Sequence, residues 1–280
     1  MTERSPARSS QSQGPTSPRS ARVVAVSALS KRQARRESGT FLVEGPQAVR
    51  EALAWGHVRG EIVSLYATAE ACARLDFLDK ATISIMIVED EIIKAMADTV
   101  TPQGVIAVCK LPTDDLQTIW NSENPKLIAI LANVRDPGNV GTVIRSADAA
   151  GADGVIISAE SVDPWSPKAV RSSAGSLWHL PVIAEAELVS VVAEISARGF
   201  QIFAADAGGS VELEELESAG KLEAPTAWLF GNEAWGLPPE VRSLADVVVS
   251  LPIFGNAESL NLSMAATLAL YSSARAQRRA

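Results

Sequence analysis

Apolar and polar positions along this chain of 280 residues alternate between strand-like and helix-like patterns. In the first part, short apolar runs rich in β-branched residues predict strands at 40–44, 62–66, 83–88 and 104–109. Stretches between them predict helices over 23–36, 47–55, 68–78 and 90–98. Because strands and helices alternate along the sequence, we expect residues 23–110 to form one compact α/β unit.

Residues 111–125 separate this unit from the rest of the chain. They contain Pro112, Pro125 and many polar residues but no long apolar run, which is typical of a linker. Residues 126–280 then show a second alternation. Strands are expected at 127–132, 154–158, 180–183, 201–206, 227–231 and 247–251, and helices at 140–150, 169–176, 186–197 and from 262 onward. Apolar residues at nearly every strand position predict a parallel sheet that is covered on both faces.

The N-terminal residues have a different composition. Residues 1–22 are rich in Ser, Pro, Gln and Arg, so we expect a disordered basic tail. Residues 1–40 hold eight basic and two acidic residues, a net charge of +6. Because the whole chain carries −8, the remaining residues carry −14. A basic arm on an acidic body indicates a polyanionic partner, whereas residues 1–20 alone read better as a solvated tail.

The rest of the composition narrows the class of protein. No apolar run approaches the roughly 18 residues of a membrane span, and no secretory signal is recognisable at the N-terminus. Cys72 and Cys109 are far apart, which favours two reduced thiols in a cytoplasmic protein. His57 and His179 have no clustered ligand partners, so we expect no metal site.

Three polar clusters follow predicted strands, at 133–145, 231–233 and 252–261. The carboxyl ends of parallel strands meet at one edge of a sheet, so these clusters are expected to share a cleft there. The glycines at 138 and 141 lack the G-x-G-x-x-G spacing of dinucleotide sites. This absence argues against the hypothesis of an oxidoreductase with a nucleotide cofactor. Phosphate-loop and G-x-S-x-G patterns are also missing from the sequence.

These clusters resemble the three signatures of a known family. The segments are NVRDPGNVGTVIRSADAAG (133–151), LFGNEAWGLP (229–238) and LPIFGNAESLNLSMAA (251–266). They are similar to those of the SpoU/TrmH branch of knotted methyltransferases, which methylate the ribose 2′-hydroxyl of RNA with S-adenosylmethionine. The segment KRQARRESGTFLVEG (31–45) resembles the substrate-binding domain of two-domain members. The resemblance implies a trefoil-knotted parallel-sheet domain preceded by a small α/β RNA-binding domain related to a ribosomal protein.

The resemblance also implies roles for single residues. Arg145 would be catalytic, but a guanidinium with a pKa above about 12 is a poor base, so we expect it to bind phosphate or the developing alkoxide. Asn133 would hold Arg145 in place, and Gly231 would let the backbone approach the cofactor. No metal is needed. The implied catalytic residues are Arg145, Asn133, Glu233, Ser259 and Asn261, and the implied cofactor-binding residues are Gly231, Leu251, Ile253 and Leu260.

Basic residues in two segments are the expected RNA contacts. They are Lys31, Arg32, Arg35, Arg36, Lys168 and Arg171. Trp165, Trp178 and Trp235 are candidates for stacking on a base, although a packing role is favoured for each and least for Trp235.

The predicted function is methylation of a ribose 2′-hydroxyl in RNA, and 23S rRNA is the substrate that we favour. The alternatives are a tRNA 2′-O-methyltransferase and a non-catalytic RNA-binding protein on the same scaffold. The resemblance implies a homodimer that pairs through the methyltransferase domain, and the Ala-rich helix from residue 262 permits the close packing that such a dimer needs. From the sequence alone, that helix is nearly as well explained as part of the core of a single chain.

Overall fold

The computed structural model describes residues 11–232 and 234–279. By internal contacts the chain divides into two compact units. The first unit extends to Pro112 and also includes Trp165–Trp178, whereas the second comprises Thr113–Pro164 and the residues from His179 onward. Thus a segment from within the predicted domain 126–280 packs with the first unit. The sequence boundaries 23–110, 111–125 and 126–280 stay predictions of where the domains begin and end along the chain.

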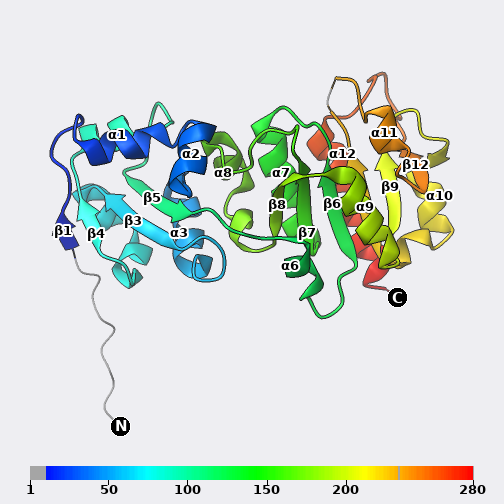
Figure 1. Ribbon diagram of the computed structural model, residues 1–280, viewed down its shortest axis with the longest axis horizontal. Helices are drawn as coiled ribbons and strands as arrows, with labels where there is room; N and C mark the ends of the chain where they lie inside the picture. The colour runs from blue at the N-terminus through cyan, green and yellow to red at the C-terminus, as the bar shows by residue number, and fades with distance from the viewer. Residues whose placement is uncertain (1–10, 233, 280) are drawn as a thin grey trace, which may run out of the picture. The chain divides into compact units, whose positions relative to one another are not determined.

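The first unit is a mixed sheet with helices around it (Figure 1). Within the described residues the strand order is β1-β4-β3-β5-β2. The strands are β1 (Gln11–Gln13), β2 (Thr40–Glu44), β3 (Ile62–Ala67), β4 (Ile85–Ile87) and β5 (Val105–Lys110). The helices are α1 (Ala21–Ala28), α2 (Arg32–Ser38), α3 (Pro46–Trp55), α4 (Ala69–Arg74), η1 (Asp76–Lys80), α5 (Asp90–Met96), α8 (Pro167–Ser173) and η2 (Ser176–Trp178).

Part of the predicted disordered tail is ordered as β1. This strand pairs in parallel with β4, with Gln11 opposite Ile85, and the Gly14 amide donates to the Ile87 carbonyl at 3.0 Å. Its side chains are exposed. The prediction of disorder over 1–22 relied on the lack of apolar burial, but an edge strand is held by backbone hydrogen bonds that any composition provides. Residues 1–10 lie outside the described part of the chain.

The predicted helix 23–36 is two helices, α1 and α2, with a bend between them. The guanidinium of Arg35 stabilises the bend, because its Nη1 donates to the carbonyl of Leu29 at 2.7 Å and of Ser30 at 3.0 Å. The last carbonyls of a helix have no intrahelical donor, so a side chain that reaches them completes the bend. Continuous helical spacing in the sequence did not reveal this interruption.

The second unit contains a sheet whose described strands all pair in parallel, which confirms the predicted α/β class. Its order is β10-β12-β9-β11-β6-β7-β8. The strands are β6 (Leu127–Leu131), β7 (Gly154–Ser158), β8 (Val182–Ala186), β9 (Gln201–Ala205), β10 (Val211–Glu212), β11 (Thr226–Phe230) and β12 (Val247–Ser250). The helices are α6 (Leu116–Trp120), α7 (Pro137–Ala150), α9 (Leu188–Ala197), α10 (Leu213–Ser218), η3 (Lys221–Glu223), α11 (Pro239–Arg242) and α12 (Leu262–Gln277).

Helices cover both faces of this sheet. Ile128 and Ile130 of β6 belong to a buried cluster with Val192 and Ile195 of α9 on one face. On the other face, Trp228 of β11 donates from Nε1 to Oγ of Ser273 in α12 at 2.9 Å. Every residue of β6, β7 and β11 is buried, as expected for a strand with two covered faces.

Helix α7 begins and ends at the residues that the sequence marks. Asp136 is its N-cap and accepts from the Asn139 amide at 2.9 Å, while Pro137 occupies the first helical position. Gly151 ends the helix in the left-handed conformation, with φ of 71°. The turn at 136–139 and the stop at Gly151 are therefore confirmed, and they place the polar residues of this segment at the carboxyl edge of the sheet.

Two further predictions concern the cysteines and membrane spans. Both cysteines are free, and burial raises the pKa of the Cys109 thiol and, to a smaller degree, of the half-buried Cys72 thiol. Among the described residues, every helix is too short or too polar to cross a bilayer.

Candidate active site

A pocket of about 430 Å³ opens in the second unit beyond the carboxyl ends of β9, β11 and β12. Its wall is formed by short segments that follow these strands and by the start of α12. The lining residues are Ala205, Asp206, Ala207, Gly231, Asn232, Ala234, Trp235, Gly236, Leu251, Ile253, Glu258, Ser259, Leu260, Leu262 and Ala265. The second and third signature segments therefore meet in one cavity, at the sheet edge where ligands bind in open α/β folds.

All four predicted cofactor residues line this pocket, namely Gly231, Leu251, Ile253 and Leu260. Three of them present apolar side chains, which suits the flat apolar face of an adenine ring. The structure brings these residues together, and their role in binding stays a prediction.

The loop that follows β11 requires a glycine at position 231. A Cβ at this position would overlap the backbone of Gly236 and Leu237. The loop closes through two backbone hydrogen bonds between Asn232 and Gly236, of 2.8 and 3.0 Å. The absence of a side chain at Gly231 thus permits this tight closure, which is a different reason from the approach to the cofactor that we predicted.

Asn232 links this loop to the first signature, a role that the sequence analysis missed. Its Nδ2 donates to the carbonyl of Asn133 at 2.9 Å, and its Oδ1 accepts from the Ala234 amide at 2.8 Å. The side chain is buried, with 6% of the residue surface exposed. The only signal in the sequence was its position directly after a predicted strand.

Asn133 is held by its backbone. It adopts a left-handed conformation with φ of 57°, which Asn tolerates better than most residues. Its amide donates to Ser158 Oγ at 3.1 Å, and its carbonyl accepts from Asn232. We expected Asn133 to hold Arg145, but within the described residues no hydrogen bond joins the two side chains.

Arg145 lies on α7 with an exposed side chain. Its guanidinium makes no hydrogen bond or ion pair with the residues that the structure describes. The next residue, Ser146, is hydrogen-bonded to Thr267 of α12 at 2.7 Å, which fixes this part of α7. Arg145 is therefore a cation on a rigid helix with all of its donors available for a ligand.

The third signature contributes Ser259 and Asn261. Asn261 is the N-cap of α12, because its Oδ1 accepts from the amide of Ser263 at 2.9 Å and from its hydroxyl. Its Nδ2 donates to Asn139 Oδ1 of α7 at 3.2 Å. Ser259 is exposed and lines the pocket. The fifth predicted catalytic residue, Glu233, lies outside the described residues.

Two carboxylates in the pocket wall were not predicted, Asp206 and Glu258. Asp206 follows β9 directly, and its Oδ1 accepts from the Gly208 amide at 2.9 Å. Its Oδ2 faces Gly236, at 3.0 Å from the position that a Cβ would occupy there. A polar residue at the end of a predicted strand was the signal that could have identified Asp206.

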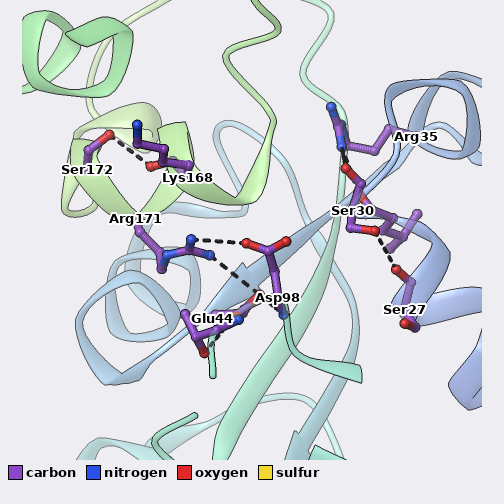
Figure 2. A network of polar contacts seen from close by, with 10 residues as sticks. Ser27, Ser30, Arg35, Glu44, Asp98, Lys168, Arg171 and Ser172 are labelled. Carbon is purple, nitrogen blue, oxygen red and sulfur yellow. Dashed lines mark hydrogen bonds and ion pairs between the residues drawn. The ribbon is translucent and has the colours of Figure 1, made fainter. Parts of the chain in front are cut away.

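The six predicted RNA contacts divide into exposed and structural residues. Lys31, Arg36 and Lys168 are exposed, and Arg32 is half-buried. Arg35 has only 3% of its surface exposed and bonds the carbonyls between α1 and α2, which favours a structural role over the predicted contact with RNA. Arg171 is also engaged, because its Nη2 lies 3.0 Å from Asp98 Oδ2 (Figure 2).

Two of the three tryptophans follow the packing alternative. Trp165 and Trp178 are buried against Phe41, with ring centroids 5.2 and 6.1 Å from it. Trp235 is 62% exposed and lines the pocket. Among the described residues, no three His, Cys, Asp or Glu side chains come together as a metal site would require.

Comparison with known proteins agrees with both parts of the chain. Residues 126–271 match the SpoU rRNA Methylase family, and residues 20–107 match the MRM3-like substrate binding domain. The 23S rRNA (guanosine(2553)-2′-O)-methyltransferase RlmP of Bacillus subtilis is 31% identical over 243 residues, covering 87% of this chain and 92% of that protein. The 23S rRNA (uridine(2479)-2′-O)-methyltransferase of Streptomyces viridochromogenes is 34% identical, with coverage of 88% and 86%.

A solved structure shows the same relationship over both units. The AdoMet-bound rRNA methyltransferase from Sinorhizobium meliloti superposes with a TM-score of 0.79 at 30% identity, covering 95% of this chain and 98% of that one. These matches confirm the predicted fold class, the methyltransferase activity and S-adenosylmethionine as the cofactor. The chain belongs to the SpoU rRNA methylase family.

Proposed function

We propose that this protein methylates a ribose 2′-hydroxyl of ribosomal RNA, and of 23S rRNA in particular. The observation that carries the proposal is the pocket in which the second and third signature segments meet. Relatives that match nearly the whole chain are named as 23S rRNA 2′-O-methyltransferases, which supports the same substrate class here.

The pocket has the composition that S-adenosylmethionine requires. Leu251, Ile253 and Leu260 supply an apolar wall for adenine, and Asp206 supplies a carboxylate that can accept hydrogen bonds from ribose hydroxyls. The volume of about 430 Å³ lies in the usual range for pockets of such ligands. When bound, the cofactor supplies a methyl group that its sulfonium has already activated.

Arg145 would then act on the RNA. An exposed guanidinium without partners among the described residues can bind the phosphate beside the target ribose or the oxygen that becomes negative as its proton leaves. A fixed cation at developing charge lowers the barrier without taking the proton itself. The proton passes to water or to a phosphate oxygen. Asn261 would position this region by capping α12 and bonding α7.

The active form is proposed to be a homodimer through the second unit. Met264, Leu268 and Tyr271 are exposed on α12 at helical spacing and form one apolar stripe. Phe254, which precedes α12, is 88% exposed. A second copy would cover these side chains. The knotted threading of the C-terminal segment and a cytoplasmic location are part of the same proposal.

The test is methyl transfer from labelled S-adenosylmethionine to total RNA from a strain that lacks the gene. We expect label in the ribose of one 23S rRNA nucleotide, located by ribose-methylation sequencing. Arg145→Ala is expected to lower the rate about 100-fold or more while cofactor affinity is unchanged, and Arg145→Lys to recover part of the rate because it keeps the charge. Label in tRNA, or an Arg145→Ala variant as active as the parent, would contradict the assignment.

A further inference from the structure

The first unit contains a second pocket, of about 330 Å³, which shares no lining residue with the cofactor pocket. It is lined by the end of β2, the start of α3, the loop before β5 and one side of α8. The lining residues are Glu44, Gly45, Pro46, Gln47, Ala48, Thr99, Thr101, Pro102, Gln103, Val105, Arg171 and Ala174. All of them belong to the first unit.

Arg171 lies in the wall of this pocket and carries a buried donor without an acceptor. Its Nη2 is paired with Asp98 Oδ2 at 3.0 Å (Figure 2). Its Nη1 is buried and finds no hydrogen-bond acceptor among the described residues, because the nearest charged oxygen, Glu44 Oε1, is 3.7 Å away. A buried donor left unpaired is unfavourable, so an acceptor on a ligand would be stabilising once the partly exposed Arg171 side chain turns Nη1 toward the pocket.

The charges around Arg171 select the kind of ligand. The carboxylate of Glu44 is already bonded to the amides of Asp98 and Thr99 and to the Thr99 hydroxyl, at 2.7, 3.2 and 2.9 Å. Among the lining residues, Glu44 and Arg171 are the charged ones, and their charges cancel. The wall therefore offers no net positive charge that would favour a phosphate, whereas a neutral group with carbonyl oxygens suits it.

The other lining residues suit a flat heterocycle. Pro46, Pro102 and Val105 give apolar surface, and the exposed side chains of Thr101 and Gln103 make no hydrogen bond with the described residues. A glutamine amide offers one acceptor and two donors, which is the pattern that reads the edge of a base. RNA-binding proteins recognise sequence mainly through unpaired bases that insert into such pockets.

We propose that this pocket takes one unpaired base of the RNA substrate, a base that presents a carbonyl oxygen to Nη1 of Arg171 and its edge to Gln103. The inference rests on the proposed function, since it presupposes an RNA substrate. In this proposal the first unit recognises a base of the RNA, in addition to the contacts that Lys31 and Arg36 make with its phosphates.

The test uses the full chain saturated with S-adenosylhomocysteine, which fills the cofactor pocket. Two labelled RNA probes with equal numbers of phosphates are compared, an octamer of uridine and an octamer of abasic tetrahydrofuran linkers. Binding of both is measured for the parent and for Gln103→Ala and Thr101→Val. These exposed side chains have no partners among the described residues, so folding should be unaffected. Gln117→Ala on α6 is the matched control, because its amide is also exposed but lies outside the pocket.

We expect the parent to bind the uridine octamer more tightly than the abasic one, and Gln103→Ala to reduce this ratio about fivefold, as for the loss of one hydrogen bond. Gln117→Ala should keep the parent ratio. An unchanged ratio in both Gln103→Ala and Thr101→Val, or equal binding of the two probes by the parent, would overturn the inference. Methyl transfer to rRNA is measured separately, so a protein that methylates RNA without this base dependence refutes the pocket alone.

Discussion

Asn232 Nδ2 donates a hydrogen bond of 2.9 Å to the backbone carbonyl of Asn133, across 99 residues of sequence. This bond joins the loop after β11 to the loop after β6 and so ties the second signature segment to the first. The two loops are neighbours because β6 and β11 pair in parallel, with Leu131 opposite Phe230.

Replacing this amide by a carboxylate should loosen the site. In Asn232→Asp a carboxylate oxygen would face the carbonyl oxygen of Asn133. Both atoms are acceptors, so no proton would lie between them and the hydrogen bond would be lost. We expect a loss of about 1–3 kcal/mol in the free energy of unfolding and weaker binding of S-adenosylmethionine. Urea unfolding and calorimetric titration measure the two effects. Asn124→Asp, at an exposed position before β6, should change neither.

Asp206 is expected to contribute to cofactor affinity. Asp206→Asn keeps the shape of the side chain but replaces a charged acceptor, so affinity for S-adenosylmethionine should fall by about tenfold or more. Hydrogen bonds to the ribose do not depend on the sulfonium charge, so S-adenosylhomocysteine should be weakened by the same factor. A loss confined to the charged cofactor would mean that Asp206 acts on the charge and not on the ribose. Glu240→Gln on α11 is the control for a neutralised exposed carboxylate.

The apolar stripe on α12 predicts the oligomeric state. Leu268 is 51% exposed, and Leu268→Glu would place a charge that a dimer interface has to bury. We expect the parent to sediment as a dimer and this variant as a monomer. Val189→Glu on α9 is the matched control, because Val189 is 53% exposed and should tolerate the change in either state. A parent that sediments as a monomer would exclude this interface.

Two exposed basic residues, Lys31 at the N-cap of α2 and Arg36 within α2, should govern the salt dependence of RNA binding. Replacing Lys31 and Arg36 by Gln is expected to flatten the slope of log affinity against log salt by about 1.4, as for two lost phosphate contacts to single-stranded RNA. Arg35→Gln should leave the slope unchanged and lower the unfolding midpoint, because Arg35 bonds the carbonyls of Leu29 and Ser30. Equal slopes in parent and double variant would remove α2 from the RNA surface.

The stability of the second unit should depend on pH through Asp153. Burial raises the pKa of this carboxyl above its ordinary value of 3.8, and the hydrogen bonds from Leu127 and Lys126 offset only part of that shift. Between 3.8 and the raised value the native state binds more protons than the unfolded chain, so this contribution to stability falls as pH rises.

Asp153→Asn removes this titration, so the variant should gain stability relative to the parent as the pH rises from 3.8 through the raised pKa, and the difference should be constant above it. Urea midpoints at several pH values measure the difference. Asp76→Asn, at an exposed position in η1, is the control for the loss of a surface carboxylate. A constant offset for Asp153→Asn would show that the Asp153 carboxyl titrates alike in both states.

The features that the sequence predicted well are those that local chemistry determines. A strand with an apolar residue at every position, such as 127–131, is compatible with little except a buried parallel strand. Gly151 after a helical pattern and Asp136 before it mark the ends of α7 because their conformations and caps are local properties. Spacing then placed the signature segments at one edge of the sheet.

The features that it missed depend on distant partners. Arg35 and Arg171 read as surface cations, but one bonds the bend between α1 and α2 and the other pairs with Asp98, 73 residues away. Nothing next to Asn232 in the sequence indicates that Asn133 is its acceptor. The strand β1 is held by the edge of β4 and not by its own composition.

The return of residues 165–178 to the first unit has a consequence for dissecting this protein. A gene cut between Pro112 and Thr113 would separate Phe41 from both Trp165 and Trp178, and would leave a buried ring on one product and two on the other without their packing partners. The N-terminal half is therefore not a cassette that can be moved to another methyltransferase by itself. A functional graft has to carry α8 and η2 with it, or find a recipient that already provides them.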